Sequence, residues 1–300
     1  MSAAELVADL WRQQSLWSRT ADRMKRRISR ARTAALAVTV TVAVLAALAG
    51  VLAAEVPVAS RVLAVAAAFG AALLPRLRPA WSGRALRDWT RARSVSEALK
   101  SEVFLWLAKA GPYRGDPDGV GLLERSNQLR DVGGDLLRHQ AGVTPDQRPT
   151  PDVHDVPSYF EARVSDQIHT YYRPRAAELQ KALRRFRAVE LGLAVLAAAI
   201  GAVAAVLGGS EWTVWIAVVT TIGAALAVHV AAARHEYQLI EFLHTAQRLE
   251  VLSARASTES TADGLDALAV AAEQVISIEN EAWMAKLAED PPDHRAKDTA

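Results

Sequence analysis

Four long runs of apolar residues interrupt an otherwise polar chain. They cover 33–54, 56–74, 188–207 and 212–233. Because a helix crosses the hydrocarbon core of a bilayer with about 20 apolar residues, each run can form a transmembrane helix. The first run begins behind a mostly polar segment and is followed by a second run, unlike a cleaved signal peptide. The pattern therefore predicts an all-α membrane protein with four spans in two hairpins.

Two of these runs contain a charged residue close to one end. Arg61 lies near the start of the second run, and Glu190 lies in the first turn of the third. Long charged side chains near the end of a span can extend to the membrane interface. We interpret both residues as interfacial, with a functional charge inside the membrane as the alternative.

Lysine and arginine residues gather beside the spans on one side of the predicted membrane. The clusters that precede the first and third spans include Lys25, Arg26, Arg27 and Arg30, and Lys181, Arg184, Arg185 and Arg187. The two hairpin turns carry Glu55 and Glu211 instead. Since basic residues favour cytoplasmic segments, we predict that both termini and the middle segment are cytoplasmic. There the bases would face anionic lipid headgroups, which explains them better than nucleic acid does.

The two halves of the chain repeat one order of features. Trp17 and Ala21 precede the basic run of the first hairpin, as Tyr172 and Ala176 precede that of the second. Both hairpins have the same predicted orientation, so the repeat is parallel. Inverted repeats are typical of many transporters, and the parallel order makes a transporter a weaker interpretation.

A second repeated pattern, Glu-x-x-x-Trp-x-Ala-Lys, follows each hairpin. Its acidic and aromatic members are Glu102 and Trp106 in the first copy, and Glu279 and Trp283 in the second. Residues four apart share one face of a helix, so each pair is a candidate latch that contacts the basic juxtamembrane helix of the same or a neighbouring subunit. The plainer alternative is an aromatic anchor in ordinary helix packing, with the glutamate paired to a base.

Outside the spans, polar segments predict long helices that form a cytoplasmic bundle. We expect helices over 2–32, 80–110, 122–139, from 158 into the third span, from the fourth span to 256, and over 265–288. Ser94 with Glu97, and Ser158 with Glu161, have the spacing of a capping box. The first pair is expected to interrupt its helix, and the second pair to begin one.

Proline, glycine and aspartate mark the boundaries between these parts. Residues 111–119 are predicted to be a loop, and the Pro/Asp-rich stretch 145–157 is the best boundary between domains. We therefore divide the chain into a first repeat at 1–142, a linker at 143–157, a second repeat at 158–290 and a disordered tail at 291–300.

Composition and motifs exclude several kinds of chemistry. The 300 residues include no cysteine, which removes disulfides, thiolate metal sites and thiol nucleophiles. His235 and Glu236 lack the second histidine of a zinc-binding helix, and Gly119 and Gly121 do not follow a strand. We therefore expect neither an enzyme nor a cofactor.

Polar residues within the spans are few. The candidates for lining or gating a pore are Thr39, Thr41, Thr213, Thr220, Thr221 and His229. A threonine hydroxyl can equally bond to its own helix, and His229 to a neighbouring helix, so both alternatives stay open. Small residues recur four apart, as Ala46, Gly50 and Ala54, as Ala197, Gly201, Ala205 and Gly209, and as Gly223, Ala227 and Ala231. Such stripes indicate helix contacts or, in an oligomer, a pore wall.

The chain resembles the SLATT family of two-span effector domains. The residues that carry the resemblance are Tyr172, Arg173, Ala176, Lys181, Glu279 and Trp283 in the second half, and Trp17, Ala21, Glu102 and Trp106 in the first. The tandem arrangement is similar to that of proteins grouped as DUF4231. The resemblance implies a membrane pore of bacterial conflict systems, including anti-phage defence, with a nucleotide second messenger or a sensor protein as its trigger. It supplies no catalytic residue.

Our leading hypothesis is a homo-oligomeric pore that permeabilises or depolarises the bacterial inner membrane. Four spans without internal charges cannot easily enclose a hydrophilic path in one copy, whereas several copies can. The alternative is a non-conducting scaffold or receptor whose cytoplasmic helices recruit a partner.

Overall fold

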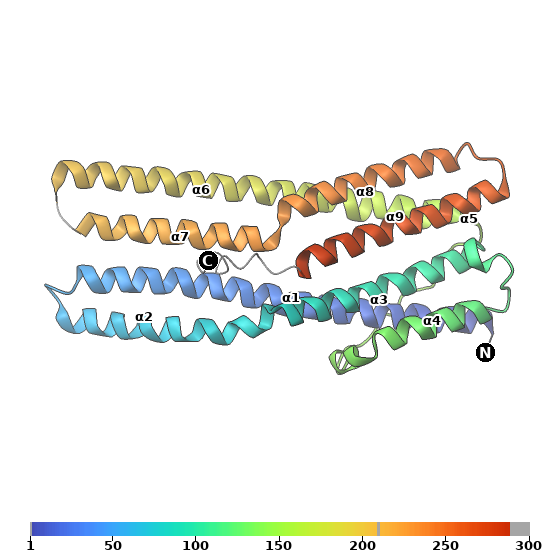
Figure 1. The fold of residues 1–300 in the computed structure, drawn as a ribbon, viewed down its shortest axis with the longest axis horizontal. Helices are drawn as coiled ribbons and strands as arrows, with labels where there is room; N and C mark the ends of the chain where they lie inside the picture. The colour runs from blue at the N-terminus through green and yellow to red at the C-terminus, as the bar shows by residue number, and fades with distance from the viewer. Residues whose placement is uncertain (1, 209–210, 289–300) are drawn as a thin grey trace, which may run out of the picture. The chain divides into compact units, whose positions relative to one another are not determined.

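The computed structural model describes residues 2–208 and 211–288, and in this part of the chain the regular elements are all helices, with no strand (Figure 1). The all-α prediction is confirmed. Among the described residues, four helical stretches are long and apolar enough to cross a membrane. They contain the third and fourth predicted runs and overlap the first two: the first stretch ends at Val51 rather than at 54, and the second begins at Pro57 rather than at 56. The predicted tail at 291–300 lies outside the described residues.

The helices form two compact units, and one of them contains the spans. This span unit comprises Arg27–Ser82 and Leu179–Glu236. Its helices are the second half of α1 (Ala3–Val51), α2 (Pro57–Leu77), most of α6 (Arg173–Leu207) and α7 (Glu211–Ala233). The hairpins are therefore α1 with α2 and α6 with α7, as predicted.

The helices of the first hairpin approach each other closely. The Ser60 hydroxyl on α2 donates a hydrogen bond to the Ala49 carbonyl on α1 at 2.7 Å. A Cβ atom at Gly70 would lie only 2.6 Å from Cγ2 of Val42. Glycine at this position lets the two backbones come together, as small residues do between helices in lipid.

The other unit, here called the packed unit, comprises Met1–Arg26, Gly83–Glu178 and Tyr237–Ala300. Besides the first half of α1, its α-helices are α3 (Gly83–Leu107), α4 (Val120–Val132), α5 (Val156–Tyr159), α8 (His235–Ala256) and α9 (Ala262–Ala288). Two π-helical segments, Phe160–Ser165 and Gln167–Tyr172, join α5 to α6. Helix α3 is central and packs against both α4 and α9.

The expected break at Ser94–Glu97 is wrong. Helix α3 runs without interruption through these residues, and Glu97 pairs with Arg93 instead of capping. The break lies earlier, in the 3-10 helix Arg78–Trp81 and Ser82 that follows α2. Pro79 has no N–H to donate and ends the α-helical ladder there.

Three further boundaries differ from the sequence expectations. The helix expected to start at Ser158 begins earlier, because Asp155 is the N-cap and Ser158 is the third residue of its capping box. The helix of the fourth span was expected to continue to 256, but it is interrupted at Arg234. This residue has a left-handed backbone with φ 49°, which separates α7 from α8. The helix expected over 122–139 becomes 3-10 at Gly134–His139, after Gly133 ends α4.

The Pro/Asp-rich linker is held against α1. Residues 143–153 form neither helix nor strand. The backbone N–H of Asp146 donates to Ser15 Oγ at 2.7 Å, and Arg148 donates to Gln14 Oε1 at 2.6 Å. The Arg148 guanidinium also lies 4.7 Å from the ring centroid of Trp11. This segment is therefore a strap with its own contacts in the packed unit.

Candidate functional site

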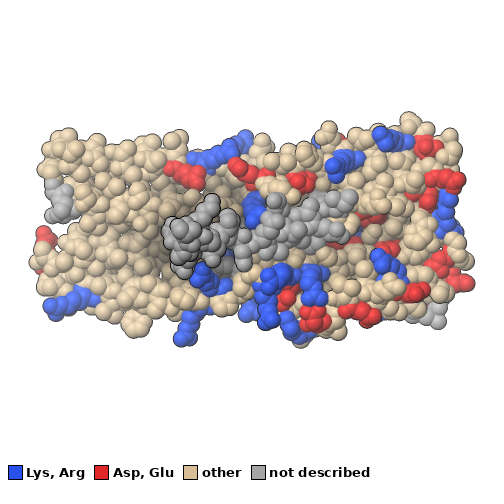
Figure 2. Space-filling model, in the orientation of Figure 1, with Lys and Arg blue, Asp and Glu red and all other residues tan. Residues whose placement is uncertain are grey.

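The span helices carry a largely apolar and exposed surface. Phe69 is 71% exposed and Val206 is 83% exposed. Among the described span residues, the buried hydrophobic ones are Ala47, Ala49, Ala67, Val218 and Val219. Figure 2 shows the span helices as an almost uncharged surface. Such a surface requires lipid or other apolar helices around it.

Three of the candidate threonines use their hydroxyls within their own helices. Thr39 donates to the Ala35 carbonyl at 2.9 Å, and Thr221 donates to the Ala217 carbonyl at 2.7 Å. Thr220 donates to the carbonyls of Ile216 and Ala217. Thr41, Thr213, Thr220 and Thr221 are exposed, and Thr39 is half-buried. The hydroxyl oxygens of these residues keep acceptor capacity for water.

His229 and the basic clusters lie at the span ends predicted to face the cytoplasm. His229 is half-buried, and Arg32, at the start of the first span, acts on it electrostatically. The eight basic residues proposed to face lipid headgroups before the first and third spans are all exposed. Arg187 donates to Glu236 Oε1 at 2.5 Å.

Two of the predicted small-residue stripes face open space within one copy. A Cβ atom at Gly50 or at Gly223 would meet nothing within 4 Å, and Ala46 and Ala54 are exposed. In the third span, a Cβ atom at Gly201 would lie 3.9 Å from Ile216 Cδ1. Gly209 lies outside the described residues. The stripes of the first and fourth spans are therefore accessible to another molecule.

A buried ion pair joins α9 to the π-helical segment in the packed unit. Arg163 is 1% exposed and donates from Nε and Nη2 to the two carboxylate oxygens of Glu273, at 2.9 and 3.1 Å. The hydroxyl of Tyr159 donates to the same carboxylate at 3.0 Å, and the Phe104 ring covers the guanidinium. Burial is the largest single influence and disfavours the charge of Arg163, but the attraction and hydrogen bonds of Glu273, together with Glu97 and Tyr159, outweigh it and raise the pKa of Arg163. We call these four residues the clamp.

Further charges on α3 surround the clamp. Burial opposes ionisation of Glu97, yet Arg93, Lys100 and Arg163 outweigh it and lower the pKa of Glu97. Burial lowers the pKa of Lys100 to about 8, with repulsion from Arg163 in the same direction. With its side-chain oxygen turned inward, Gln167 accepts from Arg163 at 3.1 Å and from Lys100 at 3.2 Å. Buried charges of this kind occur at functional sites and in structural networks alike.

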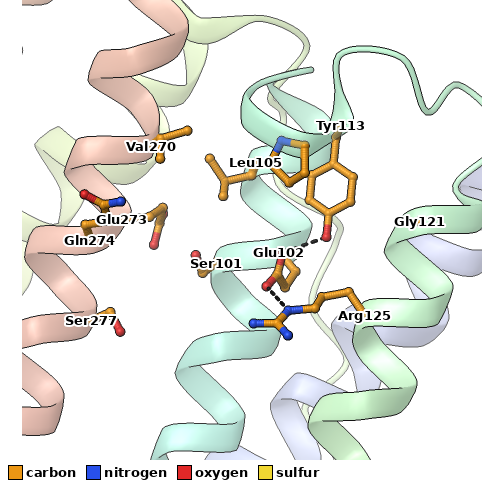
Figure 3. Close-up of a pocket in the computed structure, with 11 residues that line it drawn as sticks. Ser101, Glu102, Leu105, Tyr113, Gly121, Arg125, Val270, Glu273, Gln274 and Ser277 are labelled. Atoms are coloured by element: carbon orange, nitrogen blue, oxygen red, sulfur yellow. Dashed lines mark hydrogen bonds and ion pairs between the residues drawn. The ribbon is translucent and has the colours of Figure 1, made fainter.

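A pocket of about 510 Å³ opens between α3, α9 and the start of α4 (Figure 3). Glu102 accepts hydrogen bonds from the Tyr113 hydroxyl at 2.6 Å and from Arg125 Nε at 3.2 Å. Burial and the bond to Glu102 raise the pKa of Tyr113. Glu273 of the clamp lines the opposite wall. The pocket thus lies between two carboxylates that already have partners.

Glu102 and Trp106, the first candidate pair, both lie on α3 in this region. Glu102 pairs with Arg125 of α4, and the Trp106 indole N–H donates to the Asp116 carbonyl at 3.0 Å. The pair thereby holds the loop after α3 and the helix that follows it. Glu279 and Trp283 lie in the last part of α9, where the side chains are outside the described structure.

Sequence reasoning did not single out Arg163, Lys100 or Glu273. A signal was present for Glu273, because it lies in a stretch of α9 otherwise rich in alanine and valine. Among the described side chains of α9, the buried ones are Ala269, Ala272, Glu273 and Ile276. An acidic residue on a buried face requires a cation opposite, and that cation could not be identified without the fold.

Two family descriptions match the chain. Residues 159–283 match the "SMODS and SLOG-associating 2TM effector domain 1", and residues 14–119 match the "Protein of unknown function (DUF4231)". The residues that carried the resemblance in each half all fall within these two ranges. No curated protein and no solved structure matches the chain.

Proposed function

Because the chain belongs to the SLATT family of two-transmembrane effector domains, we propose that it is a homo-oligomeric pore of the bacterial inner membrane. The family match itself implies a membrane effector of conflict systems. The proposal adds that several copies assemble, that both termini are cytoplasmic, and that the open pore permeabilises or depolarises the membrane. It requires no catalysis and no cofactor.

The observation that carries the proposal is the exposure of the span helices within one copy. In the 18-residue apolar windows of the four helices, the buried share is 11%, 6%, 0% and 12%. Small-residue faces at Gly50 and Gly223 meet nothing within the copy. In lipid, helices associate through such faces. Association of several copies there would enclose a path that one copy cannot.

Thr220 and Thr221 are the residues we propose for the wall of the path. They are exposed polar positions on α7, and their oxygens can accept hydrogen bonds from water. The packed unit would receive the trigger, either a nucleotide second messenger or a sensor protein. Anionic headgroups would surround the basic residues beside the spans.

Flux through liposomes tests the pore. We expect purified protein to release an encapsulated dye or potassium, at rest or after addition of a panel of cyclic nucleotides and related messengers. Because the chain has no cysteine, Thr220→Cys introduces a single reactive thiol. A charged thiol reagent should reduce flux through Thr220→Cys and leave flux unchanged through the matched variant Val206→Cys. Silent liposomes with inserted, oligomeric protein would refute the pore.

A non-conducting scaffold is the second candidate function. It is favoured by apolar side chains that the packed unit leaves exposed, among them Val120 at 68%, Val132 at 63% and Ile240 at 51%. Exposed apolar patches mark protein-binding surfaces. Recruitment of a cytoplasmic protein to vesicles that show no flux would support this candidate over the pore.

A further inference from the structure

The strap, residues 143–153, covers one stripe of the first half of α1. This stripe, here called the Trp11 stripe, consists of Trp11, Gln14, Ser15 and Arg19, whose spacing places them on one face of the helix. Trp11, Gln14 and Ser15 are at most 7% exposed. The strap forms neither helix nor strand, and most of its residues are exposed. An irregular segment therefore lies over a surface that is otherwise built like an interior.

Arg148 of the strap binds to groups that α1 and α3 hold in place. Its guanidinium donates to Gln14 Oε1 at 2.6 Å and lies 4.7 Å from the centroid of the Trp11 ring. The other end of the Gln14 amide donates to the Ser96 hydroxyl at 3.0 Å, which orients it. The rings of Trp11 and Phe104 pack edge to face, with their centroids 5.8 Å apart. Both groups that contact the guanidinium are therefore preorganised for an arginine.

Asp146 adds a second point of recognition two residues earlier. Its backbone N–H donates to Ser15 Oγ at 2.7 Å, and its carboxylate pairs with Arg19. Prolines disfavour a helix in the strap; they are Pro145, Pro149 and Pro151. Proline-rich segments bind aromatic surfaces with a small loss of conformational entropy, because they are already extended. The Trp11 stripe thus recognises an Asp-x-Arg pattern on such a segment.

The strap leaves one polar group of this surface unsatisfied. The indole Nε1 of Trp11 is buried and has no hydrogen-bond partner in the described part of the chain. A buried donor without an acceptor destabilises the arrangement that encloses it. A segment that made the same aspartate and arginine contacts and also offered a carbonyl to this N–H would bind more tightly than the strap does.

We propose that the Trp11 stripe is a binding surface for an extended, proline-containing segment of a partner protein. That segment carries an aspartate and an arginine two positions apart, and the strap occupies the surface when the partner is absent. The partner displaces the strap because it satisfies the Trp11 N–H. The surface lies within the packed unit and does not require that the oligomer conducts, so the proposed pore and this surface can fail separately.

Binding of a peptide to the full chain in detergent tests the surface. The probe is a fluorescently labelled peptide with the sequence of residues 142–154, and fluorescence anisotropy measures its binding. Asp146→Ala combined with Arg148→Ala removes the strap's contacts, so this double variant should bind the peptide. The unchanged protein should bind it at least about tenfold more weakly, because its own strap competes at a high effective concentration. Arg148→Ala alone should give an intermediate affinity.

The matched control is Gln147→Ala combined with Thr150→Ala, which changes two exposed strap residues outside these contacts. It should bind the peptide as weakly as the unchanged protein does. Alanine in place of the peptide's arginine should weaken binding to the double variant about tenfold, as expected for loss of one charged contact. This last change is made in the peptide and leaves the folding of the protein untouched. Equal binding to the double variant and the control would overturn the surface, as would no binding to the double variant and to Arg148→Ala.

A panel of altered peptides tests the part assigned to the Trp11 N–H. Each position other than the aspartate and the arginine is changed in turn to glutamine, which adds a carbonyl acceptor. At least one such peptide should bind the double variant about tenfold more tightly than the strap sequence does. Trp11→Phe, added to the double variant, keeps a ring but loses the N–H, so it should remove that gain and still bind the strap sequence. No gain at any position would overturn a partner that outcompetes the strap.

The particle mass in detergent distinguishes a partner protein from a second copy of this chain. An unchanged mass in the double variant supports a partner protein as the occupant. A mass that falls in the double variant, but not in the matched control, would assign the surface to straps exchanged between copies and overturn the partner.

Discussion

The packed unit and the span unit bury different kinds of side chain. In the packed unit Trp17, Leu99, Leu122 and Tyr159 are at most 3% exposed, and even an arginine and a glutamate are enclosed. In the spans the buried hydrophobic residues are alanines and two valines, while large side chains such as Phe69 face outward. The packed unit is thus held by its own interior, as in a soluble domain. The span unit depends on what surrounds it, which the family match and the apolar surface identify as a membrane.

The largest expected effect is at the clamp. Glu273→Gln removes the charge that compensates Arg163, so we expect the free energy of unfolding of the packed unit to fall by about 3–5 kcal/mol. Denaturant unfolding in detergent, followed by tryptophan fluorescence, measures it. Glu250→Gln is the matched control, because Glu250 pairs with Arg173 at the surface; its cost should stay below about 1 kcal/mol. Similar costs at both positions would mean that the clamp is not buried in solution.

Replacing both Arg163 and Glu273 tests whether their charges or their packing stabilise the packed unit. Arg163→Met combined with Glu273→Leu fills similar volume without charge, and such exchanges are often neutral or stabilising. We expect the double variant to regain most of the stability that Glu273→Gln loses. A double variant as unstable as the single one would show that the packing of the π-helical segment, rather than the charge, carries the effect.

Lys100 gives the packed unit a specific dependence on pH. Its pKa is about 8 in the folded state against 10.5 as the ordinary value. Between these values the unfolded chain binds the proton and the folded chain does not, so stability rises with pH. The difference of about 2.5 between the two pKa values limits the gain in the free energy of unfolding to roughly 3 kcal/mol. Comparing unfolding at pH 7.5 and pH 10 with that of Lys100→Met isolates the effect, since the variant should lack this rise. A rise of the same size in Lys100→Met would assign it to other groups.

The glycines of the first hairpin distinguish contacts within a copy from contacts between copies. Gly70→Ala places a carbon 2.6 Å from Val42 and should destabilise the hairpin by about 1–3 kcal/mol. A Cβ atom at Gly50 would meet nothing within 4 Å, so we expect Gly50→Leu to leave the stability of one copy unchanged while reducing assembly. Thermal unfolding and the particle mass in detergent measure the two effects. Loss of assembly in Gly70→Ala alone would assign the interface to the other face of the hairpin.

The spans were predictable from the sequence because a helix in lipid shows itself as a long uninterrupted run of apolar residues. A helix in a bilayer needs only length and apolar composition, so the four runs and their hairpins were identified without knowledge of their neighbours. The long helices outside the spans followed from periodicity and turn residues. Their breaks were less predictable, because Ser94 and Glu97 have capping spacing but lie on a helix whose other contacts keep it continuous.

The clamp could not be predicted, because its members are far apart in the chain. Arg163 and Glu273 are separated by 110 positions, and neither lies in a motif. The π-helical geometry of 160–172 was also invisible to patterns based on a period of 3.6 residues. Such widened turns often mark functional sites, and here one of them carries Arg163. Sequence patterns over a few turns predict local structure, whereas the pairing of Arg163 with Glu273 depends on tertiary packing.

The smallest effect is expected at Lys109, where the two copies of the repeated pattern differ. In the first copy α3 ends at Leu107, and Lys109 just beyond it has a left-handed conformation with φ 55°. The Ala110 N–H donates to the Leu105 carbonyl at 2.9 Å. In the second copy α9 continues to Ala288, past the equivalent lysine at 286. A residue with a Cβ atom destabilises the folded chain by about 1–2 kcal/mol when its backbone is left-handed, and glycine avoids this cost. Glycine also gives the unfolded chain more conformational freedom, which offsets part of the gain. Lys109→Gly should therefore stabilise the packed unit by about 0.5–1 kcal/mol, and Lys109→Val should destabilise it. Thermal unfolding of the two variants measures the difference; a stabilising valine would show that Lys109 is not left-handed in solution.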